Sequence, residues 1–309
     1  MGKIAFIFPG QGAQYAGMGR DLYENIPVCR EMIDLASQAS GVSMPELLFE
    51  ENDRLNVTEY TQIAMLAVSV AALKALEEKG IHADVAAGLS LGEYGALVAA
   101  GVLTAEDAFA LVRKRGIFMQ EAVPEGGAMA AVIGSDAETI ERICRETEGQ
   151  VSVANYNCPG QIVITGEESA VAAAGEALKA AGAKRVLPLK VSGPFHSPML
   201  KKASEQLKEA LADVELHEMK IPYLTNVTGD YVKDISEVKE LLETQVCASV
   251  RWQQSVEKMI ADGVDTFVEI GPGRTLTGFL RKIDRSVKGY NVDKLEDLEK
   301  VAAELAERQ

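Results

Sequence analysis

The pattern of apolar and polar positions along this chain predicts short buried strands separated by helices. Residues 3–8 are apolar on both faces, which is typical of a strand inside a parallel sheet. Residues 58–80 form a predicted apolar helix that ends at Gly80, and residues 105–121 form a predicted helix with Thr104 as its N-cap. Strands that alternate with helices in this way indicate an α/β domain with a mostly parallel sheet.

The middle of the chain follows a different pattern, in the order βαββαβ that is typical of a ferredoxin-like unit. The predicted strands and helices of this unit cover residues 128–134, 136–148, 151–157, 161–166, 168–181 and 184–191. We therefore expect a small ferredoxin-like subdomain over residues 126–191, inserted into a large α/β-hydrolase-like domain formed by residues 1–125 and 192–309. Its expected crossing points are Gly126-Gly127 and Ser192-Gly193-Pro194.

A serine stands in the sequence GLSLG at residues 88–92, after a run of small apolar residues and before a helical pattern. This is the G-x-S-x-G form of a nucleophile elbow, in which flanking glycines leave room for a tight strand-to-helix turn. The turn places the Ser90 hydroxyl at a helix N-terminus, where unpaired N–H groups favour an oxyanion. Because the motif also occurs by chance, a catalytic role for Ser90 requires a base elsewhere in the chain.

Only three histidines are available as that base. His82 follows a helix in a turn and His217 lies in a charged stretch, so both are expected at the surface. His196 is held between two prolines and is the best candidate. No Asp or Glu stands out as a third member of a triad. We therefore expect a Ser90–His196 dyad in which a backbone carbonyl orients the imidazole.

Glycines on both sides of Gln11 let the backbone approach another group closely. A dinucleotide site is a weak interpretation, because Tyr15 stands where G-x-G-x-x-G requires its third glycine. The alternative is that Gln11 points into a site shared with Ser90.

Composition narrows the function classes. The formal net charge of −15 argues against a general nucleic-acid binder. The apolar stretch at residues 61–76 is too short and polar to span a bilayer, and the first strand does not resemble a signal peptide. The four cysteines lack the spacing of a zinc site or a disulfide framework. We expect a cytoplasmic protein with no metal, no membrane partner and no nucleic acid.

Four motifs follow one another along the chain: FPGQGAQ at residues 8–14, GLSLGEY at 88–94, NYNCPGQ at 155–161 and GPFHSP at 193–198. In this order they give the chain a resemblance to the malonyl-CoA:acyl carrier protein transacylases over its full length. The resemblance implies that Ser90 is the nucleophile and His196 the base. It also implies an oxyanion hole formed by the backbone N–H groups of Gln11 and Leu91.

The same resemblance implies the residues that hold the substrate. Arg115 matches the arginine that grips the malonyl carboxylate, and Gln245 matches the glutamine whose carbonyl orients the histidine. Asn155 matches an asparagine near the site, and Phe195 resembles the pattern of malonyl-selective members, with little room for an α-methyl group. Without the resemblance, a solvated position on a helix face would be the preferred interpretation of Arg115.

Two positions depart from the family pattern. Leu89 stands where many members have histidine, and Ser249 stands where a proline often precedes Val-Arg-Trp. Neither position takes part in the expected chemistry, and Ser249 bears on the local backbone at Gln245.

The implied activity is transfer of malonyl from malonyl-CoA to the phosphopantetheine thiol of holo-acyl carrier protein through a malonyl-serine, in fatty acid biosynthesis. No tightly bound cofactor is implied, since coenzyme A enters with the substrate and phosphopantetheine with the partner. One alternative is a free-standing acyltransferase that serves polyketide synthase carrier domains. Another is a general serine hydrolase or thioesterase, which predicts an acidic triad member and leaves Arg115 without a role. A non-catalytic carrier-binding module disagrees with the intact set of site residues.

Docking of an acidic carrier protein on this acidic chain requires a local basic patch. One candidate group flanks the inserted unit and comprises Lys184, Arg185, Lys190, Lys201 and Lys202. A second candidate group comprises Arg274, Arg281 and Lys282.

Overall fold

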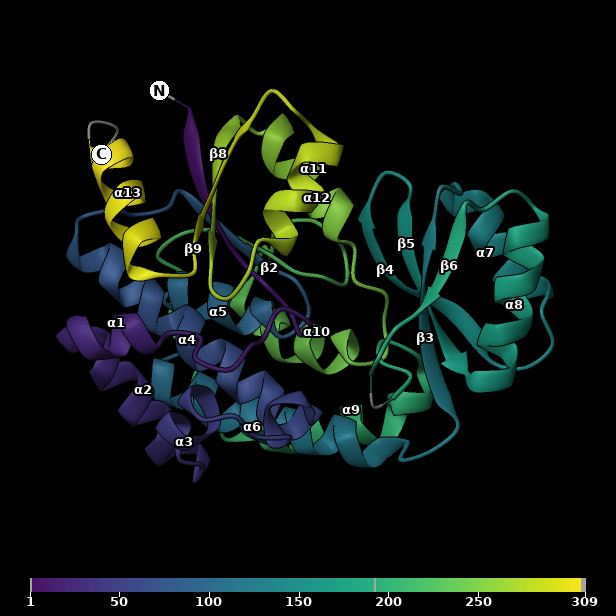
Figure 1. Cartoon of the computed structure of the whole chain (residues 1–309), viewed down its shortest axis with the longest axis horizontal. Helices are drawn as coiled ribbons and strands as arrows, with labels where there is room; N and C mark the ends of the chain where they lie inside the picture. The colour runs from purple at the N-terminus through teal and green to yellow at the C-terminus, as the bar shows by residue number, and fades with distance from the viewer. Residues whose placement is uncertain (1, 192, 307–309) are drawn as a thin grey trace.

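The structure, a computed structural model, describes residues 2–191 and 193–306 and contains two sheets with helices packed around them (Figure 1). The strands are β1 (Lys3–Phe8), β2 (Val85–Gly88), β3 (Gly127–Ile133), β4 (Val151–Cys158), β5 (Gln161–Glu167), β6 (Arg185–Pro188), β7 (Tyr223–Leu224), β8 (Val264–Ile270) and β9 (Lys288–Val292). The helices are α1 (Arg20–Asn25), α2 (Pro27–Ser40), α3 (Met44–Phe49), α4 (Thr58–Glu78), α5 (Gly92–Ala99), α6 (Ala105–Ala122), α7 (Ala137–Glu146), α8 (Glu168–Ala180), α9 (Lys201–Ala212), α10 (Val238–Gln245), α11 (Trp252–Ala261), α12 (Thr275–Ile283) and α13 (Leu295–Leu305).

The larger sheet has the strand order β7-β2-β1-β8-β9, and all four pairings are parallel. This confirms the predicted α/β class with a parallel sheet. The central strand β1 is apolar on both faces because helices cover both sides of the sheet. Phe6 and Phe8 pack into the core that contains α2, α4 and α6, whereas Ala5 and Ile7 pack into the core that contains α11 and α12.

Helix α4 is the apolar helix that the sequence predicts, and it is buried because it packs between other elements. It contacts α2 and α6, and its side chains are buried from Thr61 to Leu73 without interruption. The predicted cap of α6 is also confirmed, since Thr104 Oγ1 accepts a hydrogen bond from the Asp107 N–H at 3.1 Å. Among the described residues, none of the helices combines the length and the apolar character that a bilayer span needs.

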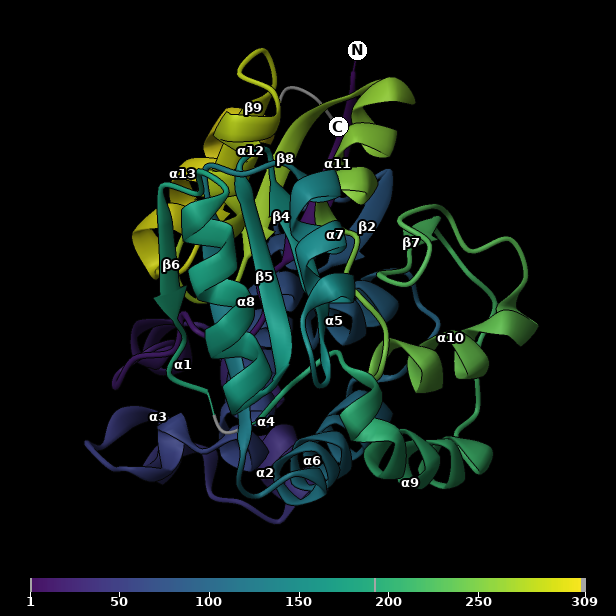
Figure 2. The same cartoon turned by 90° about the vertical axis from the view of Figure 1, so that its right-hand side faces the viewer.

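The smaller sheet has the order β4-β5-β3-β6 with antiparallel pairing throughout, which agrees with the predicted ferredoxin-like unit. Helices α7 and α8 cover one of its faces (Figure 2). Strand β6 is shorter than the predicted strand over residues 184–191. It ends at Pro188, which lies on an edge strand where a proline is tolerated, and the Leu189 N–H still donates to the Met129 carbonyl at 2.9 Å. The division at residues 126 and 191 stays a prediction, and Ser192 lies outside the described residues.

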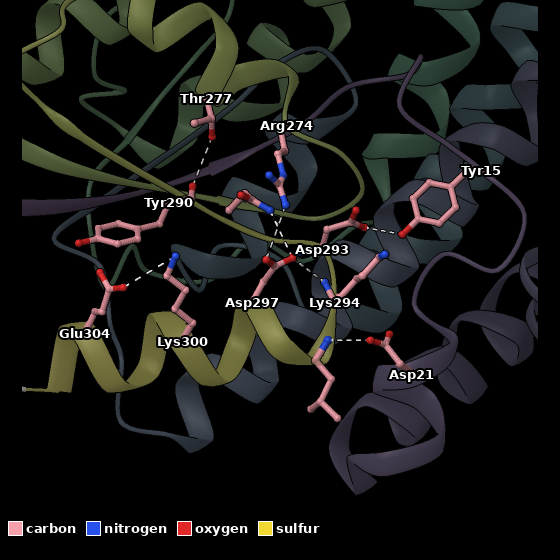
Figure 3. Close-up of polar contacts among 12 residues, drawn as sticks. Tyr15, Asp21, Arg274, Thr277, Tyr290, Asp293, Lys294, Asp297, Lys300 and Glu304 are labelled. Atoms are coloured by element: carbon pink, nitrogen blue, oxygen red, sulfur yellow. Dashed lines mark hydrogen bonds and ion pairs between the residues drawn. The ribbon is translucent and has the colours of Figure 1, made fainter.

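The loop that carries Gln11 is tied to the C-terminal part of the chain. The Tyr15 hydroxyl donates to Asp293 at 2.9 Å, and Asp21 accepts a hydrogen bond from the Leu295 N–H at 2.8 Å (Figure 3). Both contacts lie where β9 turns into α13. They fix the start of the chain against the far edge of the large sheet.

Candidate active site

Ser90 lies in the turn between β2 and α5, at the carboxyl end of the parallel sheet. Its φ of 55° is left-handed, which is strained for a residue other than glycine. The flanking glycines are needed for steric reasons. A Cβ on Gly88 would collide with the Gly92 carbonyl, and a Cβ on Gly92 would collide with the Phe8 carbonyl. The G-x-S-x-G sequence therefore forms the elbow that it predicts.

His196 contacts the serine directly. Its Nε2 lies 2.8 Å from Ser90 Oγ, and its Nδ1 lies 2.9 Å from the backbone carbonyl of Gln245. Because a carbonyl can only accept, Nδ1 carries the proton and Nε2 is left to accept from the serine hydroxyl. His196 is itself left-handed, with φ 57°, and the neighbouring Ser197 hydroxyl donates to the Pro194 carbonyl at 2.6 Å. In the described residues the imidazole is oriented by a carbonyl, not by a carboxylate.

The surroundings keep this imidazole neutral. His196 is 4% exposed. Burial, together with the nearby positive charge of Arg115, lowers the pKa of His196 to about 4. At neutral pH the side chain is therefore unprotonated and can take a proton from Ser90.

Arg115 reaches the same serine from α6. Its side chain is 1% exposed, which excludes a solvated helix-face position. Nη1 donates to Gln62 at 2.6 Å, while Nη2 donates to Gln245 Oε1 at 2.9 Å and to Ser90 Oγ at 3.2 Å. Its Nε is buried and has no acceptor among the described residues. Desolvation lowers the pKa of Arg115. Burying this cation beside the nucleophile therefore costs folding free energy.

A cavity of about 530 Å³ opens over Ser90 between the two sheets. Gln11 and Leu91 line it on the side of the large sheet, and within residues 2–191 and 193–306 their backbone N–H groups donate to no acceptor. Asn155 and Phe195 line it as well. Six of the eight predicted site residues thus line this cavity, and the other two, Arg115 and Gln245, lie behind it in contact with Ser90 and His196.

Three further residues complete the surroundings of Ser90 and were not predicted from the sequence. Gln62 holds Arg115, while Glu93 and Asn226 hold Gln245 and the serine backbone. A signal exists for two of them. Gln62 is a polar residue inside an apolar helix, and Asn226 lies two residues after β7 of the parallel sheet, at the edge where sites of α/β proteins form.

The two departures from the family pattern lie beside the site. Leu89 lines the cavity and contributes its backbone to the tight packing around Gly10. The Ser249 hydroxyl donates to the Val153 carbonyl at 2.6 Å. This bond fixes the segment after α10 against β4, so the carbonyl of Gln245 reaches His196 without a proline at position 249.

Comparison with known proteins agrees with this geometry. Residues 5–300 match the acyl transferase domain family. A malonyl CoA-acyl carrier protein transacylase of Bacillus subtilis (strain 168) is 46% identical, over 97% of this chain and 96% of the relative. The crystal structure of a malonyl CoA-acyl carrier protein transacylase from Clostridium perfringens Atcc 13124 superposes with a TM-score of 0.95 at 43% identity, covering 99% of this chain and 98% of that one.

A further solved structure shows a type II PKS acyl-carrier protein in complex with its malonyl-transacylase. It is 41% identical, with a TM-score of 0.95, over 98% of this chain and 99% of that one. Fold, cavity and matches together define an acyltransferase. Within that class, the chain belongs to the family of malonyl CoA-acyl carrier protein transacylases, as its four motifs indicate.

Proposed function

We propose that this chain transfers the malonyl group from malonyl-CoA to the phosphopantetheine thiol of holo-acyl carrier protein, through a malonyl ester on Ser90, for fatty acid biosynthesis. One observation carries the proposal: a buried guanidinium lies 3.2 Å from the hydroxyl that also contacts the histidine. Hydrolysis of a simple ester needs no buried cation at the nucleophile. A thioester with a free carboxylate supplies the direct ion-pair partner that Arg115 does not have among the described residues.

In the first half-reaction, the Ser90 hydroxyl gives its proton to His196 Nε2 while Oγ forms a bond to the thioester carbonyl carbon. The resulting oxyanion would be stabilised by the backbone N–H groups of Gln11 and Leu91, which have no acceptor within the described residues. As the carbon–sulfur bond breaks, the imidazolium returns its proton to the leaving thiolate. Coenzyme A departs as the thiol, and malonyl remains as an ester on Ser90.

The second half-reaction repeats these steps with a different thiol. His196 takes the proton of the phosphopantetheine thiol, the sulfur attacks the ester carbonyl, and Ser90 Oγ leaves and regains a proton from the imidazolium. Both thiols arrive on other molecules, so the reaction needs no tightly bound cofactor. Apolar side chains from the small sheet, Met129, Ala131 and Val163, line the cavity and disfavour water near the ester.

The guanidinium of Arg115 offers one edge to the malonyl carboxylate. Nε and Nη2 project their N–H groups from the same side of the planar group. Nε has no acceptor among the described residues, and the Nη2 bond to Ser90 Oγ is released when Oγ becomes acylated. The opposite nitrogen, Nη1, stays on Gln62 and fixes the plane. This supports bidentate binding of a carboxylate.

A second candidate function keeps the chemistry and changes the carrier. The solved complex of a malonyl-transacylase with a type II PKS acyl-carrier protein involves a protein 41% identical to this chain. The acceptor here could accordingly belong to a polyketide synthase, and assays with both carrier proteins distinguish the two. A cytoplasmic location remains part of the proposal.

Intact-mass spectrometry tests the proposal directly. Incubation with malonyl-CoA is expected to add one malonyl group to the protein, and addition of holo-acyl carrier protein is expected to remove it. Ser90→Ala should abolish the adduct. Peptide mapping should place it on Ser90, because burial raises the pKa of the Cys158 and Cys247 thiols and leaves them poor nucleophiles. An adduct on either cysteine would contradict the assignment.

A further inference from the structure

Glu93 is a buried carboxylate for which the proposed reaction has no chemical step. It lies in the first turn of α5, three residues after the nucleophile, and is 0% exposed. Its Oε2 accepts two hydrogen bonds, from the side-chain amide of Gln245 at 2.7 Å and from the backbone N–H of Asn226 at 3.0 Å. These donors come from the end of α10 and from the turn after β7, so one oxygen atom joins three separate segments.

Both partners of Glu93 hold the backbone of the nucleophile. Asn226 Oδ1 accepts from the Ser90 N–H at 2.6 Å, and Asn226 Nδ2 donates to the Gly88 carbonyl at 2.6 Å. Gln245 Nε2 donates to the Ser90 carbonyl at 3.0 Å. The left-handed conformation of Ser90 is therefore held from both sides of its Cα. A strained backbone conformation of this kind persists only where several surrounding contacts hold it in place.

The same carboxylate also acts on the histidine. Gln245, whose side chain Glu93 binds, supplies the backbone carbonyl that accepts from His196 Nδ1 at 2.9 Å. The amide of Gln245 cannot rotate freely, because Oε1 accepts from Arg115 while Nε2 donates to Glu93. The Gln245 side chain is thus fixed at both of its polar atoms, by the guanidinium of Arg115 on one side and the carboxyl group of Glu93 on the other.

We propose that Glu93 is a positioning residue. By binding Asn226 and Gln245, it keeps the Ser90 hydroxyl and the His196 imidazole at hydrogen-bonding distance from each other. This inference rests on the proposed roles of Ser90 and His196. Loss of the carboxylate releases the turn that carries the serine and the carbonyl that orients the histidine at the same time. A displacement of about 1 Å between reacting groups costs roughly 10²-fold in rate.

The test compares Glu93→Gln, which keeps the shape and an oxygen acceptor, with Glu93→Leu, which keeps the size without an acceptor. Two readouts are needed: the rate at which a fluorophosphonate labels Ser90, and kcat and KM for malonyl-CoA. Glu93→Leu is expected to lower labelling and kcat by about 10²-fold with little change in KM, and Glu93→Gln by about tenfold or less. Ser255→Ala is the matched control, since among the described residues this buried hydroxyl bonds only to the Arg251 carbonyl, one turn back along the chain.

A folded Glu93→Leu protein that labels at the wild-type rate would overturn the inference, as would a Gln variant that loses as much as the Leu variant. If Glu93→Leu does not fold, Asn226→Ala decides, because it removes the acceptor of the Ser90 N–H and should slow labelling about tenfold or more. Unchanged labelling there also overturns the inference. Labelling involves no malonyl group, so a wild-type protein that labels but does not transfer malonyl contradicts the proposed function alone.

Discussion

The two sheets contribute to the same cavity in opposite ways. The parallel sheet, its helices and the loop at residues 193–198 supply the strained backbone and the buried ionisable groups around Ser90, including Arg115 and Glu93. The antiparallel sheet supplies uncharged side chains, such as Met129 and Asn155. The difference indicates that bond making depends on the large sheet, whereas the shape of the cavity and the approach of the acceptor depend on the small one.

Arg115 gives the largest effect on the side of the parallel sheet. Arg115→Ala is expected to lower kcat/KM for malonyl-CoA by about 10²- to 10³-fold, since truncating one member of a buried charge pair costs ~2–5 kcal/mol. Transfer of acetyl should hold or rise, because an unpaired buried cation no longer opposes it. Arg115→Lys should restore little, because an ammonium cannot present two parallel N–H groups.

Steady-state rates with both thioesters, in the wild type and in both variants, check this prediction. The acetyl rate is the internal control for folding, because a misfolded protein loses both activities. If malonyl and acetyl transfer fall together, Arg115 is a structural residue and another group holds the carboxylate.

Phe195 is expected to have an intermediate effect, on the choice between malonyl-CoA and methylmalonyl-CoA. Its ring is buried and lines the cavity next to His196. An extra methyl group in such a place costs ~1–3 kcal/mol, so methylmalonyl-CoA should be a poor substrate, about 10- to 100-fold below malonyl-CoA. Phe195→Ala should narrow the ratio of the two kcat/KM values. Equal values in the wild-type protein would show that the ring does not set the choice.

Substitutions in the first group of basic residues, which flanks the inserted unit, are expected to have the smallest effect on the reaction. Lys190 lines the cavity two residues after the end of β6, whereas Lys184 and Arg185 lie at the start of that strand and do not line it. Lys190→Glu is therefore expected to raise KM for holo-acyl carrier protein several-fold, and more than Lys184→Glu does. Lys233→Glu, on another exposed loop, is the charge-matched control.

Single-turnover malonylation separates docking from other causes. The rate from malonyl-CoA should stay unchanged in Lys190→Glu if the lysine serves the carrier protein. Equal losses in both half-reactions would instead assign Lys190 to coenzyme A binding or to folding.

The sequence predicts those structural features that a local pattern of residues determines. The bounds of β1 agree with the predicted range of residues 3–8, and the elbow at Ser90 follows from its two glycines. The contact between Asn226 and Ser90 could not be predicted in this way. It depends on the parallel pairing of β7 with β2, which joins segments 136 positions apart and leaves no periodic trace in either of them. Glu93 lies inside a recognised motif, but its role becomes visible only once its two distant donors are in place.

Ser90 and His196 are the two non-glycine residues with positive φ among the described residues, and this has a consequence for the stability of the whole chain. Each such residue costs roughly 1–3 kcal/mol of folding free energy, which is a sizeable part of the net free energy of unfolding of an ordinary domain. Glycine at either position would relax the backbone and end the chemistry. Thermal tolerance and turnover are thus set against each other at the same two positions. Selection of variants for heat resistance alone would favour an inactive protein.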